Sequence, residues 1–171
     1  MLNEKSTKEE IAKYLLTTFF IYKQAKESEK EFDEFLNEEV FPDLGYESII
    51  NDYYFSLKYL FDKKYIAGNF RLKYESDYEF IDDELQEVAK KDSLDFVECE
   101  VNDVKLTLKS QALVLTQLGK DLLTDLINND NINEIANGTY ELLKILLPQI
   151  ITALTTAEII AIIKELGILI L

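Results

Sequence analysis

Two stretches in which the spacing of the hydrophobic residues changes constrain the fold of this chain more than any other feature. In residues 46–74 a helical spacing changes after Gly68-Asn69 into the alternation of a half-buried strand. In residues 104–126 the order is reversed, because a strand-like alternation comes first and Thr116 then caps a helix. The sequence therefore predicts a helix and strand that pair with a later strand and helix. The apolar residues that define these four elements are Ile50, Tyr53, Tyr54, Leu57, Leu60 and Phe61, then Phe70, Leu72 and Tyr74, then Val104, Leu106 and Leu108, and finally Leu115 and Leu123.

The flanking segments add more helices. The residues Thr7-Lys8-Glu9-Glu10 form a capping box, and one apolar stripe follows it, made of Ile11, Tyr14, Leu15, Phe19 and Tyr22. A weaker stripe continues to Pro42, which stops it. Residues 77–91 predict a short acidic helix inserted before the return strand. We therefore expect an α+β fold that is mainly helical.

From residue 139 to residue 171 the chain is mostly aliphatic and predicts a helical hairpin, preceded by a polar loop at 128–138. Its longest uncharged run, Ile145–Ala157, has 13 residues, whereas a membrane-spanning helix needs roughly 20, so no transmembrane span is predicted. The apolar end must dock on the domain, on a second copy or on a membrane surface. The apolar residues near this end cover more than one face of a helix, so we expect them to form a homo-oligomer. These residues are Ile159, Ile160, Ile162, Ile163 and Leu166.

The charge is strongly negative, with 33 acidic and 18 basic residues and a net charge of -15. Two segments carry much of it: Glu27–Glu47 has nine acids and only Lys30, and Glu75–Glu100 has eleven acids with Lys90 and Lys91. A field of this sign repels nucleic acid and favours a basic protein partner, although acidic surfaces also serve solubility. The candidate partner-binding residues are Glu75, Asp77, Glu79, Asp82, Asp83, Glu84 and Glu87.

One stretch of this acidic sequence has a positive net charge. Between Lys58 and Lys73 the only acid is Asp62. This stretch would lie at the end of a helix and on the following strand, where phosphates are contacted in DNA-binding folds. The other interpretation is compensation of the helix dipole. The candidate nucleic-acid-binding residues are Lys58, Lys63, Lys64, Arg71 and Lys73.

The residues needed for common catalytic sites are missing from this sequence. Histidine is absent, which excludes Ser-His-Asp and Cys-His catalysis and most transition-metal sites. Cys99 lies between Glu98 and Glu100, which oppose formation of a thiolate. The acids of Asp82-Asp83-Glu84 point in different directions on a helix, so we interpret them as a solvated helix start. We therefore expect a non-enzymatic protein without cofactor or metal.

The compartment is predicted from two features. A single cysteine precludes an intramolecular disulfide and fits a reducing compartment. The segment MLNEKSTKEE lacks the apolar run of a signal peptide. We expect a cytoplasmic protein.

The order of helix, helix, strand, strand and helix, the segment SLKYLFDKKYIAG and the motif L-T-x-x-G-x-x-x-L at Leu115, Thr116, Gly119 and Leu123 resemble small winged-helix proteins of phages and Firmicute bacteria. The resemblance covers about residues 46–127 and implies a fold while leaving activity open. It implies a winged-helix-like domain over 1–127, with an acidic insert at 75–100 and the helical tail at 139–171.

Two functions fit these observations. The first is an acidic protein-interaction module, phage-encoded, whose carboxylates stand in for DNA phosphates and occupy a basic surface of a nucleic-acid-handling or defence protein. The second is a winged-helix transcriptional regulator that binds DNA through Lys58–Lys73. The charge of the whole chain favours the first.

Overall fold

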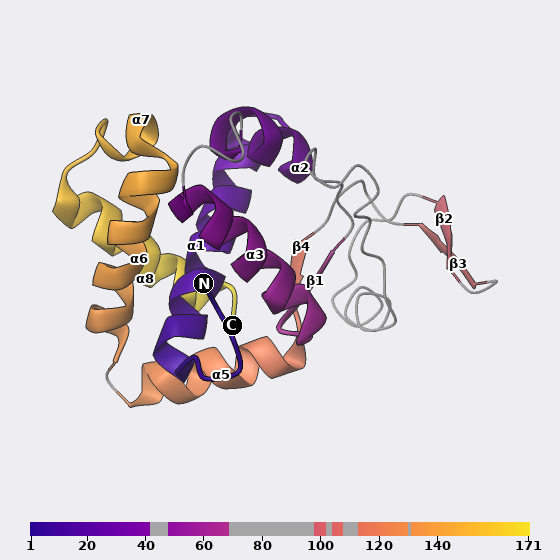
Figure 1. Ribbon diagram of the computed structural model, residues 1–171. Helices are drawn as coiled ribbons and strands as arrows, with labels where there is room; N and C mark the ends of the chain where they lie inside the picture. Colours follow the sequence, from indigo (N-terminus) through magenta and orange to yellow (C-terminus); the bar gives the residue numbers. More distant parts are fainter. Residues whose placement is uncertain (42–47, 69–97, 102–103, 108–112, 130) are drawn as a thin grey trace.

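The computed structural model describes residues 1–41, 48–68, 98–101, 104–107, 113–129 and 131–171. Figure 1 shows α1 (Lys8–Glu27) in the middle of the helices, with α3 (Ser48–Asp62) on one side and α6 (Ile132–Leu146) and α8 (Thr156–Leu169) on the other. The described part of the chain is thus mainly helical with short antiparallel strand pairs, which confirms the expected α+β class at this level.

Helix α1 is the centre of the core. Thr7 caps it, because its hydroxyl accepts the Glu10 backbone N–H at 3.2 Å, as the capping box predicts. The sequence predicted that one apolar stripe of this helix is buried, but the buried surface is wider. Other faces of the helix are also buried, at Leu16, Thr17, Phe20 and Ile21. The reason is that helices from both ends of the chain pack around α1.

The segment after α1 turns back over its end. Glu29 has φ of 56°, and the backbone N–H of Lys30 donates to the Ala25 carbonyl, so α1 ends in a left-handed cap. The short helix α2 (Phe32–Phe35) follows, and a π-helical turn (Leu36–Val40) continues it. The buried side chains of this segment are Phe32, Phe35, Leu36, Val40 and Phe41. Their burial leaves the charged residues between them on the outside.

Helix α3 ends in the same kind of cap and leads directly into the sheet. Lys64 has φ of 66°, and the N–H of Tyr65 donates to the Leu60 carbonyl. Strand β1 (Ile66–Gly68) then pairs antiparallel with β4 (Leu113–Leu115), with Ile66 opposite Leu115 and Gly68 opposite Leu113. Both strands are buried. Gly68 and Leu113, which are 45 positions apart in the sequence, therefore lie side by side.

The start of α5 (Gln117–Asn128) is tied to the end of α3. The Thr116 hydroxyl accepts the Gly119 N–H at 3.2 Å and lies 2.5 Å from the Lys64 carbonyl oxygen and 2.9 Å from that of Tyr65. A Cβ atom on Gly119 would collide with the Tyr65 carbonyl oxygen. The L-T-x-x-G motif thus joins two elements that are distant in sequence.

The predicted strand at Val104 is present as β3 (Val104–Thr107) and pairs antiparallel with β2 (Glu98–Val101). Only residues 102 and 103 separate these strands in the sequence, which is the spacing of a hairpin. The predicted strand at 70–74 and the predicted helix at 77–91 lie outside the described residues.

The C-terminal helices pack on the rest of the chain. Helix α6 contacts α1, the single turn α7 (Pro148–Ile151) starts at the proline, and α8 contacts both α6 and α1. Helix α6 begins at Ile132, inside the stretch expected as a polar loop. Gly138 is accommodated there because the Lys13 side chain lies against it. Thr155 caps α8 by accepting the Glu158 N–H at 3.2 Å.

Candidate functional site

An acidic surface covers the end of α1, α2 and the π-helical turn. We use this name for the exposed carboxylates of Glu27, Glu29, Glu31, Glu34, Glu38 and Glu39. The only basic residue among them, Lys30, lies 2.7 Å from a Glu38 carboxylate oxygen and 3.5 Å from one of Glu39. The hydrogen bond from Lys30 to Glu38 raises the pKa of the Lys30 ammonium. The one cation within residues 27–39 is thus already paired with two carboxylates of this surface.

The sequence-predicted partner-binding acids belong to another segment. All of them, from Glu75 to Glu87, lie outside the described residues. Within the part that the structure describes, the acids adjoining Cys99 are on β2. The acidic surface around α2 therefore lies wholly within the described residues, whereas the predicted partner-binding acids do not.

The predicted basic site is only partly described, because Arg71 and Lys73 fall outside the described ranges. Lys63 is paired with Glu4 at 2.5 Å, and this hydrogen bond raises the pKa of the Lys63 ammonium. The Lys58 ammonium lies 5.8 Å from the centroid of the Tyr54 ring. Lys64 is the left-handed residue that ends α3. The lysines thus cluster at the end of α3, as expected, and at least Lys63 already has an acidic partner.

An N-terminal arm, residues 1–4, covers the outer face of α3. Leu2 is 4% exposed, and its backbone N–H donates to the Ser56 hydroxyl at 3.0 Å. Glu4 reaches Lys63 two turns further along the helix. The arm thereby covers Ser56, which is 0% exposed.

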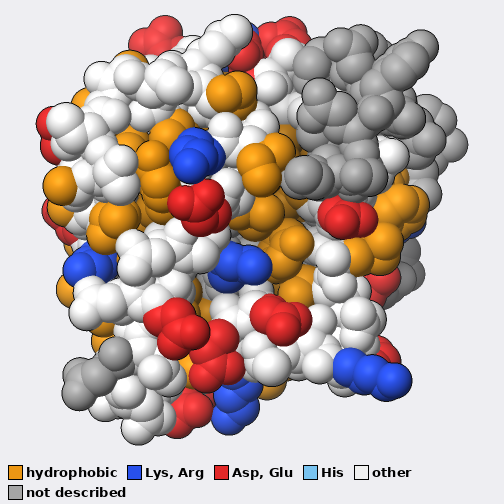
Figure 2. All heavy atoms as spheres, turned by 60° about the vertical axis from the view of Figure 1, so that its left-hand side comes forward, with side chains coloured by type: hydrophobic (Ala, Val, Ile, Leu, Met, Phe, Trp, Pro, Cys, Tyr) orange, Lys and Arg blue, Asp and Glu red, His pale blue; other side chains and the backbone are white. Residues whose placement is uncertain are grey.

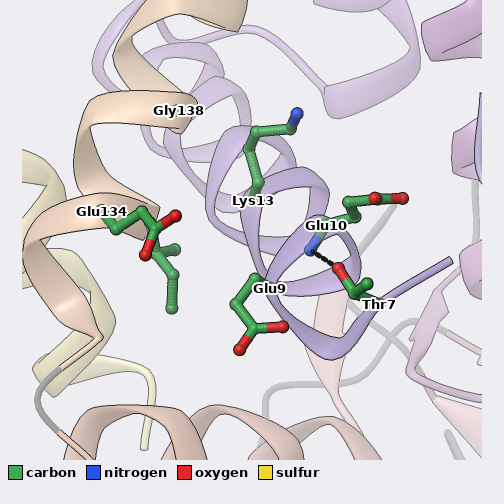
Figure 3. Close-up of a pocket in the computed structure, with 7 residues that line it drawn as sticks. Thr7, Glu9, Glu10, Lys13, Glu134 and Gly138 are labelled. Atoms are coloured by element: carbon green, nitrogen blue, oxygen red, sulfur yellow. Dashed lines mark hydrogen bonds between the residues drawn. The ribbon is translucent and has the colours of Figure 1, made fainter.

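A pocket of about 280 Å³ lies between the start of α1 and α6. Figure 3 shows Glu9 and Glu134 on opposite sides of this space, with Thr7 and Glu10 joined by the capping hydrogen bond. Lys13, Ile135 and Gly138 complete the described lining. Acids in the first turn of a helix offset its dipole, which accounts for Glu9 and Glu134 without a ligand. No cluster able to hold a metal ion occurs among the described residues.

A second, more apolar hollow is formed where α1, β4, α5 and the end of α8 meet. This apolar groove has a volume of about 470 Å³. Its apolar lining includes Phe19, Leu113, Val114, Leu115, Leu166, Leu169 and Ile170, and its charged lining is Lys23, Lys26 and Lys120. Sequence analysis missed this groove because its walls come from four segments, none of which carries a binding motif.

The predicted oligomerisation residues divide into two groups. Ile159 and Ile163 are fully buried within the chain, and Leu166 is 7% exposed. Ile160 and Ile162 are partly buried against the core. The most exposed apolar residues of the tail are instead Ile168 and Leu169, at 65% and 70%. Figure 2 shows hydrophobic side chains interspersed with charged ones on the face that carries α6, α7 and α8.

Within the described ranges, no helix combines the length and apolarity required to span a bilayer. Comparison of the chain with protein-family models, curated proteins and solved structures gives no match. Function is therefore argued from the residues of this chain.

Proposed function

We propose that this protein is a non-enzymatic acidic interaction module that binds, and thereby blocks, a basic surface on a nucleic-acid-handling or defence protein. The observation that carries the proposal is the acidic surface around α2, where six exposed carboxylates surround a single lysine that two of them already neutralise. Carboxylates held on a folded surface steer and orient a basic partner, as phosphates do in DNA.

Rigid support strengthens this proposal. The apolar side chains between the acids, among them Phe32 and Phe35, are 1% and 2% exposed. The Phe32 ring also packs edge to face on Tyr22, with centroids 5.7 Å apart. Carboxylates on a well-packed helical segment lose little conformational freedom on binding. The same segment on a disordered chain would bind more weakly.

The proposed architecture is a winged-helix-like domain. Helix α3, the β1–β4 pair and α5 follow one another in the chain, which supports this proposal, and the segment between the two strands would be the wing. The sequence between the strands contains the acidic stretch at 75–100. A phage origin and a cytoplasmic location belong to this proposal as well, and they rest on the sequence alone.

The alternative is a DNA-binding regulator that uses the lysines at the end of α3. One observation favours it, namely that Lys58, Lys63 and Lys64 gather on one helix end in an acidic chain. The N-terminal arm opposes it, because this arm covers part of α3 and pairs Glu4 with Lys63. Duplex binding would have to displace the arm and overcome the net charge of -15.

The deciding experiment is a pull-down from host lysate, with and without nuclease, using the intact protein and two triple variants. The test variant is Glu34→Gln/Glu38→Gln/Glu39→Gln. The control is Asp121→Asn/Glu141→Gln/Glu165→Gln, which removes the same charge from exposed positions on α5, α6 and α8. We expect a basic protein that survives nuclease, is retained by the control and is lost by the test variant.

Two results would contradict the proposal. Equal capture by both variants would show that the acidic surface is not the binding site. Recovery of DNA alone, abolished by nuclease, would establish the regulator, and its duplex affinity should then fall steeply with added salt and on Lys63→Ala/Lys64→Ala.

A further inference from the structure

The apolar groove has the dimensions and lining of a ligand site. Its volume of about 470 Å³ lies within the range of about 300–1,000 Å³ that is usual for small-molecule sites. Such sites are mostly apolar and contain a few polar groups that fix the orientation of the ligand. Here the floor is aliphatic and aromatic, from Phe19 on α1 to Leu166 on α8.

The charge of the groove is opposite to that of the molecule. The charged residues that line it are Lys23, Lys26 and Lys120, and no acid is found among the described lining residues. Lys23 and Lys26 are three apart on α1 and so share one side of the helix, whereas Lys120 comes from the first turns of α5. The groove thus carries three cations although the chain has 33 acids and only 18 bases.

The position of Lys26 is fixed by an aromatic contact. Its ammonium lies 4.6 Å from the centroid of the Tyr22 ring, which also lines the groove. A cation over a ring face keeps its full positive charge, because the ring attracts it electrostatically without neutralising it. The Lys26 ammonium can therefore still attract an anion. The groove therefore presents a positioned positive charge beside apolar surface.

We propose that this groove binds a single-chain amphiphilic anion, such as a medium-chain fatty acid. The alkyl chain would lie along the floor formed by Leu113, Leu115 and Leu166, and the carboxylate would lie at the lysines. Charge complementarity is the reason for choosing an anion, and the contiguous apolar floor is the reason for choosing an alkyl chain. The acidic surface begins at Glu27, next to Lys26, but the two proposed sites use different residues and neither proposal depends on the other.

The test is titration of the full chain with decanoate, followed by calorimetry, at pH 7 and below the concentration at which decanoate forms micelles. We expect saturable 1:1 binding, with 1-decanol binding about tenfold more weakly because it lacks the charge. Non-specific adsorption of an anion is disfavoured by the net charge of -15. Saturable binding therefore indicates a local cationic site.

Two pairs of variants locate the site. Lys23→Glu/Lys26→Glu should weaken decanoate binding at least about tenfold, whereas Lys5→Glu/Lys144→Glu, which changes the charge equally outside the groove lining, should weaken it far less. Leu169→Glu, at a position 70% exposed, should also weaken binding, whereas Leu154→Glu, at a position 39% exposed outside the lining, should not. Both positions are exposed, so both variants should keep the wild-type fold, and circular dichroism checks this.

Four results would overturn the proposal. Three of them are non-saturable uptake, equal affinity for decanoate and 1-decanol, and equal affinity in the two lysine variants. A fourth is binding to phosphatidylglycerol vesicles that disappears in Lys23→Glu/Lys26→Glu while free decanoate does not bind. That result would assign the groove to a membrane surface.

Discussion

A buried hydroxyl pair shows what a single residue contributes to this core. The Thr18 hydroxyl donates to the Tyr14 carbonyl at 2.8 Å, so its lone pairs are left to accept the Tyr53 hydroxyl at 3.0 Å. Tyr53 is 0% exposed. Burial raises the pKa of Tyr53 above its ordinary value of 10.0. The neutral phenol is therefore the form that the fold requires.

Replacing Tyr53 by Phe should alter the response to alkaline pH. In the unfolded chain Tyr53 ionises near pH 10, whereas in the folded chain it stays neutral to higher pH. Its contribution to stability is thus complete below pH 10 and is lost as the pH rises toward the folded-state pKa. The slope is about 1.4 kcal/mol per pH unit at most. Urea unfolding at pH 8, 10 and 11 should show a smaller alkaline loss for Tyr53→Phe than for the wild type.

The variant also has a cost at neutral pH. Loss of the hydrogen bond to Thr18 should lower the free energy of unfolding by about 1 kcal/mol at pH 7. Tyr140→Phe is the matched control, because Tyr140 is only half-buried on α6. If the pH dependences of the wild type and Tyr53→Phe run parallel, the proposed role of the buried phenol is wrong.

At the scale of single elements, the local signals for helix starts were reliable. The caps at Thr7 and Thr116 were predicted correctly because each hydroxyl accepts an N–H three residues away. The hairpin partner of β3 was not predicted, because the segment before it, Glu98–Val101, has only four residues and two of them are acids. The breadth of the buried surface on α1 was missed, since a sequence pattern does not show how many neighbours will pack on a helix.

The glycine of the L-T-x-x-G motif should be indispensable for packing. In Gly119→Ala the new methyl would meet the Tyr65 carbonyl oxygen and Leu115, and backbone cannot move aside as a side chain can. We expect a loss of about 1–3 kcal/mol in the free energy of unfolding. The measurement is chemical denaturation monitored by circular dichroism.

Gly167→Ala provides the control within another helix. A methyl there lies 3.5 Å or more from its nearest neighbours, at ordinary contact distance. Alanine also favours a helix over glycine by up to about 1 kcal/mol, so this variant should be neutral or more stable. Equal effects of the two substitutions would refute the packing role assigned to Gly119.

At the scale of the whole molecule, the sequence predicted the features formed by one continuous segment. It missed the features formed by segments that are distant in the sequence. The acidic surface is contiguous in sequence, so its charge could be predicted, although the neutralisation of Lys30 could not. The apolar groove is assembled from α1, β4, α5 and α8, and no local signal announces it. The covering of α3 by Leu2 and Glu4 was also missed, because the contact to Ser56 spans 54 residues.

Self-association through the tail stays a prediction, and the structure shows how to test it. Deleting the tail would remove Ile159 and Ile163 from the core and would confuse unfolding with dissociation. Ile168→Lys/Leu171→Lys changes exposed residues instead. We expect light scattering to report an oligomer for the wild type and a monomer for this variant.

The control for this experiment is Leu118→Lys/Ile145→Lys, at exposed apolar positions on α5 and α6. This variant should retain the wild-type oligomeric state. The prediction of self-association is wrong if the wild type is monomeric over the whole accessible concentration range. It is also wrong if both variants dissociate alike.

The pairing of β1 with β4 has an evolutionary consequence. Gly68 lies opposite Leu113, so the chain between them begins and ends at neighbouring points on the core. Lengthening such a connection adds little closure entropy, which grows only with the logarithm of its length. Mutation can therefore extend, trim or exchange the stretch from 69 to 112 while the register of the two strands stays the same.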